Sequence, residues 1–314
     1  MQIQILKLEN TVNFMKLRIP AMVFSTILII ASIGSLVVNQ LNWGLDFTGG
    51  TVIQVNYPDG ADLELVRDKL GNADFPDAVV QNFGSSQEVL IRVAPRDDVN
   101  AETIGDLVLA ALKEGTPNVE MQRIEFVGPN VGEELTEQGG LAMLVALICV
   151  LIYVAMRFEY RFALGSVSAL AHDVILTLGL FSFLQLEFDL TVLAALLAVI
   201  GYSLNDTIVV CDRIRENFRK VRKGGPEEVV NISLTQTMNR TIVTSVTTIL
   251  VLTALFYKGG ALIHGFATAL LFGVFIGTYS SVYIASSVAL FLGVSKEDLM
   301  PPEVEVEGED LESY

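Results

Sequence analysis

The sequence predicts a polytopic α-helical membrane protein with six transmembrane helices and an α+β, ferredoxin-like domain between the first and second helices. Its 314 residues are 52% hydrophobic and only 18% charged, and the mean hydropathy is +0.53. A chain of this composition is too apolar for an ordinary soluble protein. Two further observations define the parts of the fold: six long apolar runs, and a change of apolar period after the first run.

Each apolar run is long enough to cross about 30 Å of hydrocarbon as a helix that rises about 1.5 Å per residue. The spans must be helices, because in lipid every backbone polar group needs an internal partner. This organisation excludes a cytosolic enzyme, a nucleic-acid-binding protein and a disordered acidic scaffold. The runs occupy residues 19–38, 139–156, 162–184, 190–211, 241–257 and 265–292.

Between the first two runs the apolar residues alternate in some segments and follow a helical period in others. These patterns predict strands and helices in the order β-α-β-β-α-β, which is the ferredoxin-like arrangement. That fold hosts many functions and by itself indicates none. The predicted elements are a strand at 51–57, a helix at 61–72, a hairpin of 78–83 with 88–94 across GSSQ, a helix at 101–114 and a strand at 119–127.

The formal charge of −16 is concentrated in two segments outside the apolar runs. Residues 39–137 contain 18 acidic and 6 basic residues, and residues 296–314 contain 8 acidic residues and one lysine. Two strongly acidic segments disfavour a polyanionic partner, so we expect no nucleic acid to bind.

Basic residues in the short connections predict the orientation, because positively charged loops remain on the cytoplasmic side. They gather on the side of both termini, whereas the opposite connections at 185–189 and 258–264 contain only Lys258. Both termini are therefore expected to be cytoplasmic. The predicted regions are a cytoplasmic N-terminus with the first helix at 1–38, an outer domain at 39–137, a five-helix transmembrane region at 138–293 and an acidic cytoplasmic tail at 294–314.

Asp206 and Arg240 are the first candidates for a functional site, because a charge in hydrocarbon costs about 3 kcal/mol on insertion scales. Both lie near the cytoplasmic side, in the fourth and fifth spans, at similar depth by helical rise. One interpretation is a structural ion pair that fixes helix packing. The other is a proton site, in which burial favours protonated Asp206 and the permanent charge of Arg240 favours proton release.

Asp173 lies about 17 Å into the third span, near the middle of the membrane, beside His172. Consecutive helical residues point about 100° apart, so the two side chains are not expected to form a dyad on one face. His172 fits either a hydrogen-bonded packing residue or a relay. Asp173 is the stronger candidate for a proton relay, because a carboxyl group at this depth is costly.

The fifth span begins with a hydroxyl-rich face. Such side chains either bond to the backbone of their own helix or line a path for protons or water, and both interpretations stay open. The candidate polar pathway comprises Thr241, Thr244, Ser245, Thr248, His172 and Asn205.

We expect no disulfide or metal framework, because Cys149 and Cys211 fall at different depths in the spans and residues 39–137 contain no cysteine. In the sixth span small residues, including Gly273 and Gly277, recur every fourth position. This pattern predicts close helix packing without chemistry.

Several motifs resemble the SecF family of membrane subunits, which work with SecD beside the Sec protein-export channel. The motif at 201–217 is long and idiosyncratic, whereas LDFTGG alone would be weak. The chain lacks the LDLRGG-type signature and the larger outer region expected of SecD, and its single set of six spans does not fit a fused SecDF. The motifs are LDFTGGT at 45–51, VGPNVGEEL at 127–135, HDV at 172–174, GYSLNDTIVVCDRIREN at 201–217 and MNRTIVTSVTT at 238–248.

The resemblance implies an RND-type membrane half that pairs with SecD about a pseudo-twofold axis in the bacterial cytoplasmic (inner) membrane, with residues 39–137 periplasmic. It implies use of the proton-motive force to promote protein export, with the proton as coupling ion and no cofactor. The Asp of NDT and the Arg of NRT, linked to proton passage in the family, correspond to Asp206 and Arg240. The implied partners are SecD, the SecYEG channel, YajC, YidC, exported unfolded proteins and membrane lipid.

These expectations combine into one mechanistic hypothesis: protonation of Asp206 weakens its contact with Arg240, the spans repack, and residues 39–137 move relative to the outer domain of SecD. Each proton that crosses supplies about 2.3 kcal/mol per 100 mV, enough to bias two packed states that differ by a few kcal/mol. Two glycine-containing segments beside the membrane are candidate hinges or plain turns. They contain Gly49, Gly50, Gly128, Pro129 and Gly132.

Three other functions are weighed against this hypothesis. An intramembrane aspartyl protease needs two facing carboxyl groups, but Asp173 and Asp206 differ in depth by about 8 Å, and YSLN precedes Asp206 where GxGD is expected. A scaffold subunit without its own proton pathway is the second alternative. The third is an RND-type exporter of lipids or small molecules, which the small outer domain disfavours.

Overall fold

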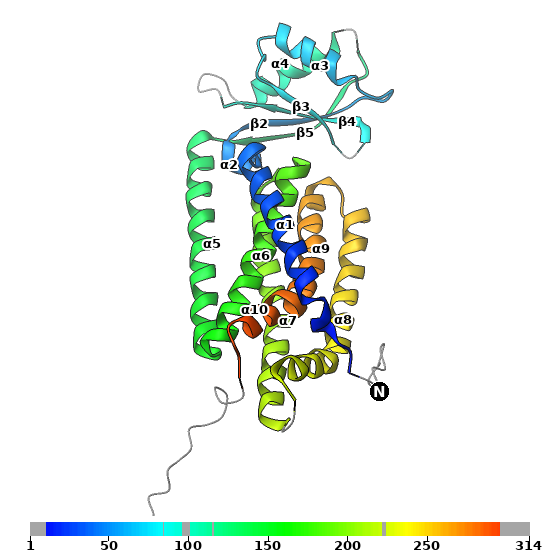
Figure 1. The fold of residues 1–314 in the computed structure, drawn as a ribbon. Coiled ribbons are helices and arrows are strands. Elements are labelled where there is room, and N and C mark those ends of the chain that lie inside the picture. Colours follow the sequence, from blue (N-terminus) through cyan, green and yellow to red (C-terminus); the bar gives the residue numbers. More distant parts are fainter. Residues whose placement is uncertain (1–10, 84, 96–100, 115, 222–223, 296–314) are drawn as a thin grey trace, which may run out of the picture.

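The computed structural model describes residues 11–83, 85–95, 101–114, 116–221 and 224–295, and the predicted acidic tail from residue 296 onward lies outside them. Its helices form a bundle with a small α/β domain at one end (Figure 1). Six helical segments in the described residues are long and apolar enough to cross a membrane, as predicted. They are α1 (Arg18–Val38, preceded by the 3₁₀ turn Phe14–Leu17), α5 (Pro129–Arg157), α6 (Tyr160–Leu184), α7 (Leu190–Lys220), α8 (Pro226–Lys258) and a sixth span of α9 (His264–Ser280), the π-helical turn η3 (Ser281–Ala285) and α10 (Ser286–Phe291).

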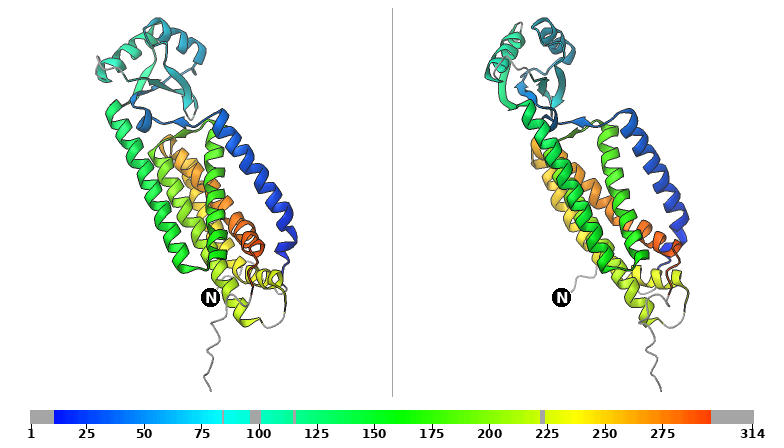
Figure 2. Two further views of the ribbon diagram at one scale, coloured as in Figure 1. Left: turned by 60° about the vertical axis from the view of Figure 1, so that its left-hand side comes forward. Right: turned by 90° about the vertical axis from the view of Figure 1, so that its left-hand side faces the viewer.

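Helix α7 is the centre of the bundle and packs against α6, α8 and α9. Its buried residues recur three and four apart, as in Val192, Ala195, Val199 and Ser203, so one continuous face is enclosed. Helix α1 packs along α6, and α1 and α5 flank the bundle in the left view of Figure 2. Asp206, on α7, therefore lies in the most enclosed part of the membrane region.

The outer domain has the predicted β-α-β-β-α-β order and a four-stranded antiparallel sheet in the order β3-β4-β2-β5. Helices α3 and α4 cover the face turned away from the bundle, and the opposite face looks toward the membrane end (Figure 1). The core beneath the helices includes Ile53, Ile91 and Val108. The elements are β2 (Gly50–Asn56), α3 (Leu63–Asn72), β3 (Val79–Phe83), β4 (Ser85–Val93), α4 (Ala101–Lys113) and β5 (Glu120–Val127).

Three details differ from the sequence-based expectation. Strand β4 begins at Ser85, so the hairpin is tighter than the predicted turn across GSSQ. Helix α5 begins at Pro129, so residues 129–137, assigned above to the outer domain, already continue into the second span. Helix α8 begins at Pro226, well before the apolar run at 241–257. Apolar runs mark only the hydrocarbon-crossing part of a helix, whose polar ends extend into water.

A short junction that the sequence did not predict joins the outer domain to the membrane region. The two-residue strand β1 (Asn42–Trp43) pairs in parallel with β6 (Glu187–Phe188), which connects α6 to α7. The short helix α2 (Leu45–Thr48) follows, and its Asp46 Oδ2 accepts a hydrogen bond from the Leu190 backbone N–H at the start of α7. The base of the outer domain is therefore bonded directly to the helix that carries Asp206.

The candidate hinge residues lie at this same junction. Gly49 and Gly50 have φ values of 66° and 115°, in the region that favours glycine. A Cβ atom on Gly132 would lie 2.9 Å from the Gly49 backbone nitrogen, so the start of α5 and the end of α2 meet backbone to backbone. Gly128 is the N-cap of α5 and Pro129 its first residue. The hinge role of these residues stays a prediction.

Candidate functional site

Asp206 occupies the buried face of α7, with only 3% of its surface exposed. Its Oδ2 atom is fully enclosed and accepts no hydrogen bond within the described part of the chain. Buried polar atoms in native proteins are nearly always paired, so an unpaired carboxylate oxygen in the bundle requires an explanation. A group that gains and loses a proton during its working cycle is one explanation that suits a carboxyl group.

Arg240 lies on the neighbouring helix α8, close enough to Asp206 for electrostatic interaction. In the described structure the Arg240 guanidinium group and the Asp206 carboxyl group are too far apart to form an ion pair. Arg240 is exposed at the surface of the bundle, in contrast to Asp206. The structure thus brings the predicted pair together on adjacent helices but leaves a separation between the charged groups.

Asp173 is completely buried and ties three helices together. Its Oδ2 atom accepts hydrogen bonds from the hydroxyl groups of Ser203 on α7, at 2.5 Å, and Ser280 on α9, at 2.8 Å. A carboxylate that accepts several hydrogen bonds compensates part of the cost of its burial. Asp173 therefore differs from Asp206: its carboxyl group is well paired.

The structure corrects the expectation that His172 and Asp173 do not form a dyad. The His172 Nδ1 and Asp173 Oδ1 atoms are 2.9 Å apart and both side chains are buried. The 100° between consecutive helical positions separates the Cβ atoms but does not prevent a long imidazole from bending toward its neighbour. Burying a polar group without a partner is costly, so a buried polar group pairs with a nearby partner. The His172 Nε2 atom is buried without a hydrogen-bond partner in the described structure.

The candidate hydroxyl residues on α8 divide into two groups. Thr244 and Thr248 donate hydrogen bonds to carbonyl groups one turn earlier in their own helix. This is the first of the two interpretations given above, in which the hydroxyl groups bond to the backbone of their own helix. Thr241 is buried. Ser245 instead reaches across helices, 2.7 Å from the Thr278 hydroxyl on α9 and within 3.4 Å of the Tyr202 hydroxyl on α7. Only Ser245 among the four makes a described side-chain contact between helices.

A second set of hydroxyl groups, which the sequence did not single out, lies around Asp173 and along the turn of α7 that carries Asp206. Ser203, bonded to Asp173, precedes Asp206 by three residues and therefore lies about 4.5 Å from it along the α7 axis. The next residue, Thr207, is 2.8 Å from the Ser281 hydroxyl in the π-helical turn of the sixth span. Ser281 belongs to the small-residue pattern of that span, interpreted as packing alone, and Ser203 and Thr207 lie in the motif at 201–217.

The packing interpretation of the small residues is nevertheless confirmed. A Cβ atom on Gly273 would lie 2.2 Å from a Val199 methyl group, and one on Gly277 would lie 3.0 Å from Ser203 Cβ. Helices α7 and α9 therefore approach each other as closely as their backbones allow. This close approach is what places Ser280 and Ser281 against α7.

The one remaining candidate lies away from the buried polar groups. Asn205, next to Asp206 in sequence, is exposed at the bundle surface. Cys149 is exposed and Cys211 is buried, and the described residues contain no group of three His, Cys, Asp or Glu side chains that could hold a metal ion. What the described residues provide is proton-binding and hydrogen-bonding chemistry.

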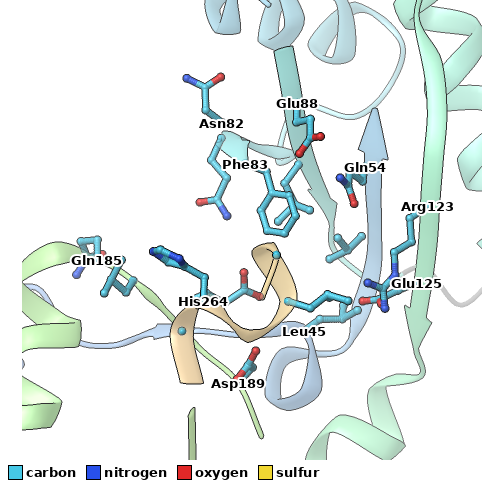
Figure 3. A pocket seen from close by; sticks show the side chains of 18 of the residues that line it. Leu45, Gln54, Asn82, Phe83, Glu88, Arg123, Glu125, Gln185, Asp189 and His264 are labelled. Atoms are coloured by element: carbon cyan, nitrogen blue, oxygen red, sulfur yellow. The ribbon is translucent and has the colours of Figure 1, made fainter. Parts of the chain in front are cut away.

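A hollow of about 650 Å³ lies between the uncovered face of the sheet and the membrane end of α8 and α9 (Figure 3). Phe83 and Glu88 form part of its upper wall, and Leu45, His264 and Asp189 lie below them. Beside it, Arg92 on β4 pairs with Glu187 at 2.7 Å and donates to the Trp43 carbonyl group. Burial raises the pKa of Glu187, and the neighbouring Arg92 charge opposes this shift.

Comparison with known protein families gives two matches. Residues 108–295 match the C-terminal region of the protein export membrane proteins SecD and SecF, and residues 34–57 match the SecD/SecF GG motif. The chain is 62% identical over 310 residues to the protein translocase subunit SecF of Vibrio alginolyticus, covering 98% of each chain. It is 48% identical over 303 residues to the subunit of the same name from Escherichia coli O157:H7, covering 96% of this chain and 94% of that one.

The fold is similar to a crystal structure of SecDF, a translocon-associated membrane protein, from Thermus thermophilus, with a TM-score of 0.83 and 36% identity. The match covers 92% of this chain but only 39% of the longer SecDF chain. A second structure, of SecDF in a super-membrane-facing form, matches with a TM-score of 0.67 at the same 36% identity, over 90% of this chain.

Proposed function

The chain belongs to the SecF family of protein translocase subunits, and from this premise we propose that it couples proton movement through the bundle to protein export, in partnership with SecD. The observation that carries the proposal is the buried Oδ2 atom of Asp206, which has no hydrogen-bond partner among the described residues and lies beside the unpaired charge of Arg240. A carboxyl group held only for structure would be expected to be paired. Asp206 is the residue that binds and releases the proton, and Arg240 favours its release.

Asp173 is the second proton-binding group of this pathway. Ser203 and Thr207 lie within one turn of Asp206 on α7 and carry hydrogen bonds to Asp173 and Ser281. Protonation changes the hydrogen bonds that each carboxyl group can accept, and so the fit between α6, α7 and α9. The hydroxyl group of Ser245 extends the polar contacts to α8.

Transmission to the outer domain follows the junction described above. Helix α7 carries Asp206 and begins at Leu190, whose N–H group is bonded to Asp46 at the base of the outer domain. A shift of α7 therefore acts directly on that base, with Gly49, Gly50, Gly128, Pro129 and Gly132 as the hinges. The two SecDF structures, which match this chain at 0.83 and 0.67, support the existence of more than one arrangement.

SecD is the partner that the bundle surface favours. Arg240 and Asn205 are exposed within membrane-spanning helices, where contact with lipid is costly. A second helical half covering this surface would remove that cost, and this chain spans only 39% of the longer SecDF chain that it resembles. A disulfide between Asn205→Cys, in a chain whose Cys149 and Cys211 are changed to serine, and a cysteine in SecD tests this directly. Trp43→Cys, at the outer end, is the control that should not cross-link to the same SecD position.

The wider setting follows from the family. We infer that the chain lies in the bacterial cytoplasmic membrane with both termini cytoplasmic and the α/β domain periplasmic. SecYEG delivers the exported chain, YajC and YidC are further partners, and the subunit acts as a transporter component without enzymatic turnover. The alternative, a scaffold subunit without its own proton pathway, predicts that all carboxyl groups in the bundle are replaceable.

Export measurements in membranes that lack the endogenous subunit distinguish these two functions. Asp206→Asn is expected to reduce proton-motive-force-dependent export to the level without the subunit, and Asp206→Glu to restore part of it. Asp68→Asn makes the same chemical change on the exposed surface of α3 and is expected to leave export unchanged. Wild-type export by Asp206→Asn, with normal SecD association, would establish the scaffold function instead.

A further inference from the structure

We propose that the ends of α5 and α7 farthest from the outer domain form a binding site for the phosphate headgroup of an anionic phospholipid. A hollow of about 430 Å³ lies between these helix ends. Helix α7 extends beyond the end of α5 at this side of the bundle (Figure 1). The lining side chains are Arg157, Asp212, Arg215, Glu216, Arg219 and Lys220, with four basic and two acidic groups.

The acidic groups of the hollow already have basic partners. The Arg157 guanidinium group lies 2.6 Å from the Asp212 carboxylate and joins α5 to α7. Glu216 pairs with Arg213 at 2.8 Å and with Lys220 at 2.5 Å. These pairs satisfy both carboxylates of the lining without Arg215, which makes no described ion pair. Arg215 is therefore a positive charge of the hollow that these two acids do not pair.

Arg215 supplies the specific feature that points to a ligand. Its Nε atom is buried and has no hydrogen-bond partner among the described residues. The enclosed Nε atom itself is out of reach of a ligand, so recognition falls to the terminal nitrogens of the guanidinium group at the wall of the hollow. The guanidinium group presents parallel donors that match two oxygens of a phosphate. Arg215 lies on the same face of α7 as Asp212 and Arg219, which line the hollow.

The depth of the hollow matches the headgroup layer. Arg157 is the last residue of the second span, and its ion pair fixes Asp212 at the same level. Arg215 follows Asp212 by three residues, about 4.5 Å farther along the helix axis. The headgroup layer extends roughly 5–7 Å beyond the hydrocarbon on each side. Arg215 is therefore placed where the phosphate of a phospholipid lies.

The surface of α5 favours a lipid over a free phosphate ion. Its exposed apolar side chains lead along the helix to the hollow, and Met156, next to Arg157, is 79% exposed. A phospholipid bound by Arg215 could lay its acyl chains along this surface and so gain apolar contact that a free ion lacks. Basic pockets between helices at the cytoplasmic surface are suited to anionic headgroups. The apolar residues of this surface are Leu141, Leu144, Val145, Ile148, Ile152 and Met156.

Native mass spectrometry of the full chain, taken from nanodiscs of phosphatidylcholine with and without phosphatidylglycerol, tests the proposal. Wild-type protein is expected to retain phosphatidylglycerol preferentially. Arg215→Gln should retain about tenfold less, because a hydrogen bond to a charged group is worth about 1.5 kcal/mol. Arg18→Gln removes an equivalent charge from the same side of the bundle, outside the hollow, and should retain the wild-type amount. Equal retention by Arg215→Gln and Arg18→Gln would overturn the proposal.

Two further measurements keep the proposal testable if Arg215→Gln does not fold. Inorganic phosphate added to phosphatidylcholine nanodiscs should not raise the melting temperature of the wild-type chain, whereas phosphatidylglycerol should. Equal stabilisation by phosphate would assign the hollow to a free ion. A photoactivatable phosphatidylglycerol should label α5 near Met156 more strongly than its phosphatidylcholine analogue, and equal labelling would contradict a headgroup-selective site.

Discussion

Asp206 on α7 and Arg240 on α8 lie within electrostatic reach of each other, yet the described structure contains no ion pair between them. The carboxyl group is buried with one oxygen unpaired, and the arginine is exposed at the bundle surface. A static structural ion pair would be expected to satisfy both groups. Their separation is instead compatible with a contact that forms and breaks as the bundle changes its packing.

Replacing the two buried aspartates by alanine should destabilise the protein to different extents. Asp173→Ala removes the acceptor of the Ser203 and Ser280 hydroxyl groups and is expected to cost about 3 kcal/mol. Asp206→Ala removes a carboxyl oxygen that no donor contacts, so its cost should stay below about 1 kcal/mol. Thermal unfolding of both variants in detergent measures the difference. A larger loss for Asp206→Ala would show that Asp206 is primarily a structural residue.

The close approach of α7 and α9 predicts a strong effect at a single glycine. Gly273→Ala places a methyl group 2.2 Å from Val199 and should cost about 1–3 kcal/mol. Gly201→Ala, on α7, meets no atom within 4 Å and should be neutral or slightly stabilising, because alanine is the better helix former. Melting temperatures of the two variants test this contrast. Equal melting temperatures would mean that α7 and α9 are not tightly packed in the membrane.

The junction between the outer domain and the membrane region should depend on pH through Glu187. Burial raises its pKa above the ordinary glutamate value, so the docked state holds a proton at pH values where a solvated carboxyl group has released it. The contact between the outer domain and the membrane region is therefore most stable at pH values below the raised pKa of Glu187. It weakens as the pH rises through that pKa. Backbone amide hydrogen exchange of residues 42–46 and 187–190, corrected for the intrinsic rate, should therefore become faster as the pH rises through the pKa of Glu187.

Two variants separate this effect from general acid sensitivity. Glu187→Gln should remove the pH dependence of exchange at the junction. Arg92→Gln removes the charge that opposes the shift, and should move the transition to higher pH. Unchanged pH dependence in Glu187→Gln would exclude Glu187 as the titrating group.

The sequence predicted the six spans and the order of the outer domain, because apolar runs and apolar periods are local features. It also selected Asp206, Arg240 and Asp173, because charged groups in apolar runs are conspicuous. The contacts of Ser203, Ser280 and Thr207 depend on which helices become neighbours, and no local pattern contains that information. The two-residue strands β1 and β6 were likewise too short to produce an alternating pattern.

Proton flux into proteoliposomes that contain the chain together with SecD tests the central claim most directly. With an imposed proton gradient, the wild-type chain should admit protons at a measurable rate, Asp206→Asn should reduce the rate to that of protein-free liposomes, and Asp68→Asn should match wild type. A wild-type proton flux through correctly inserted, SecD-bound Asp206→Asn would contradict the account.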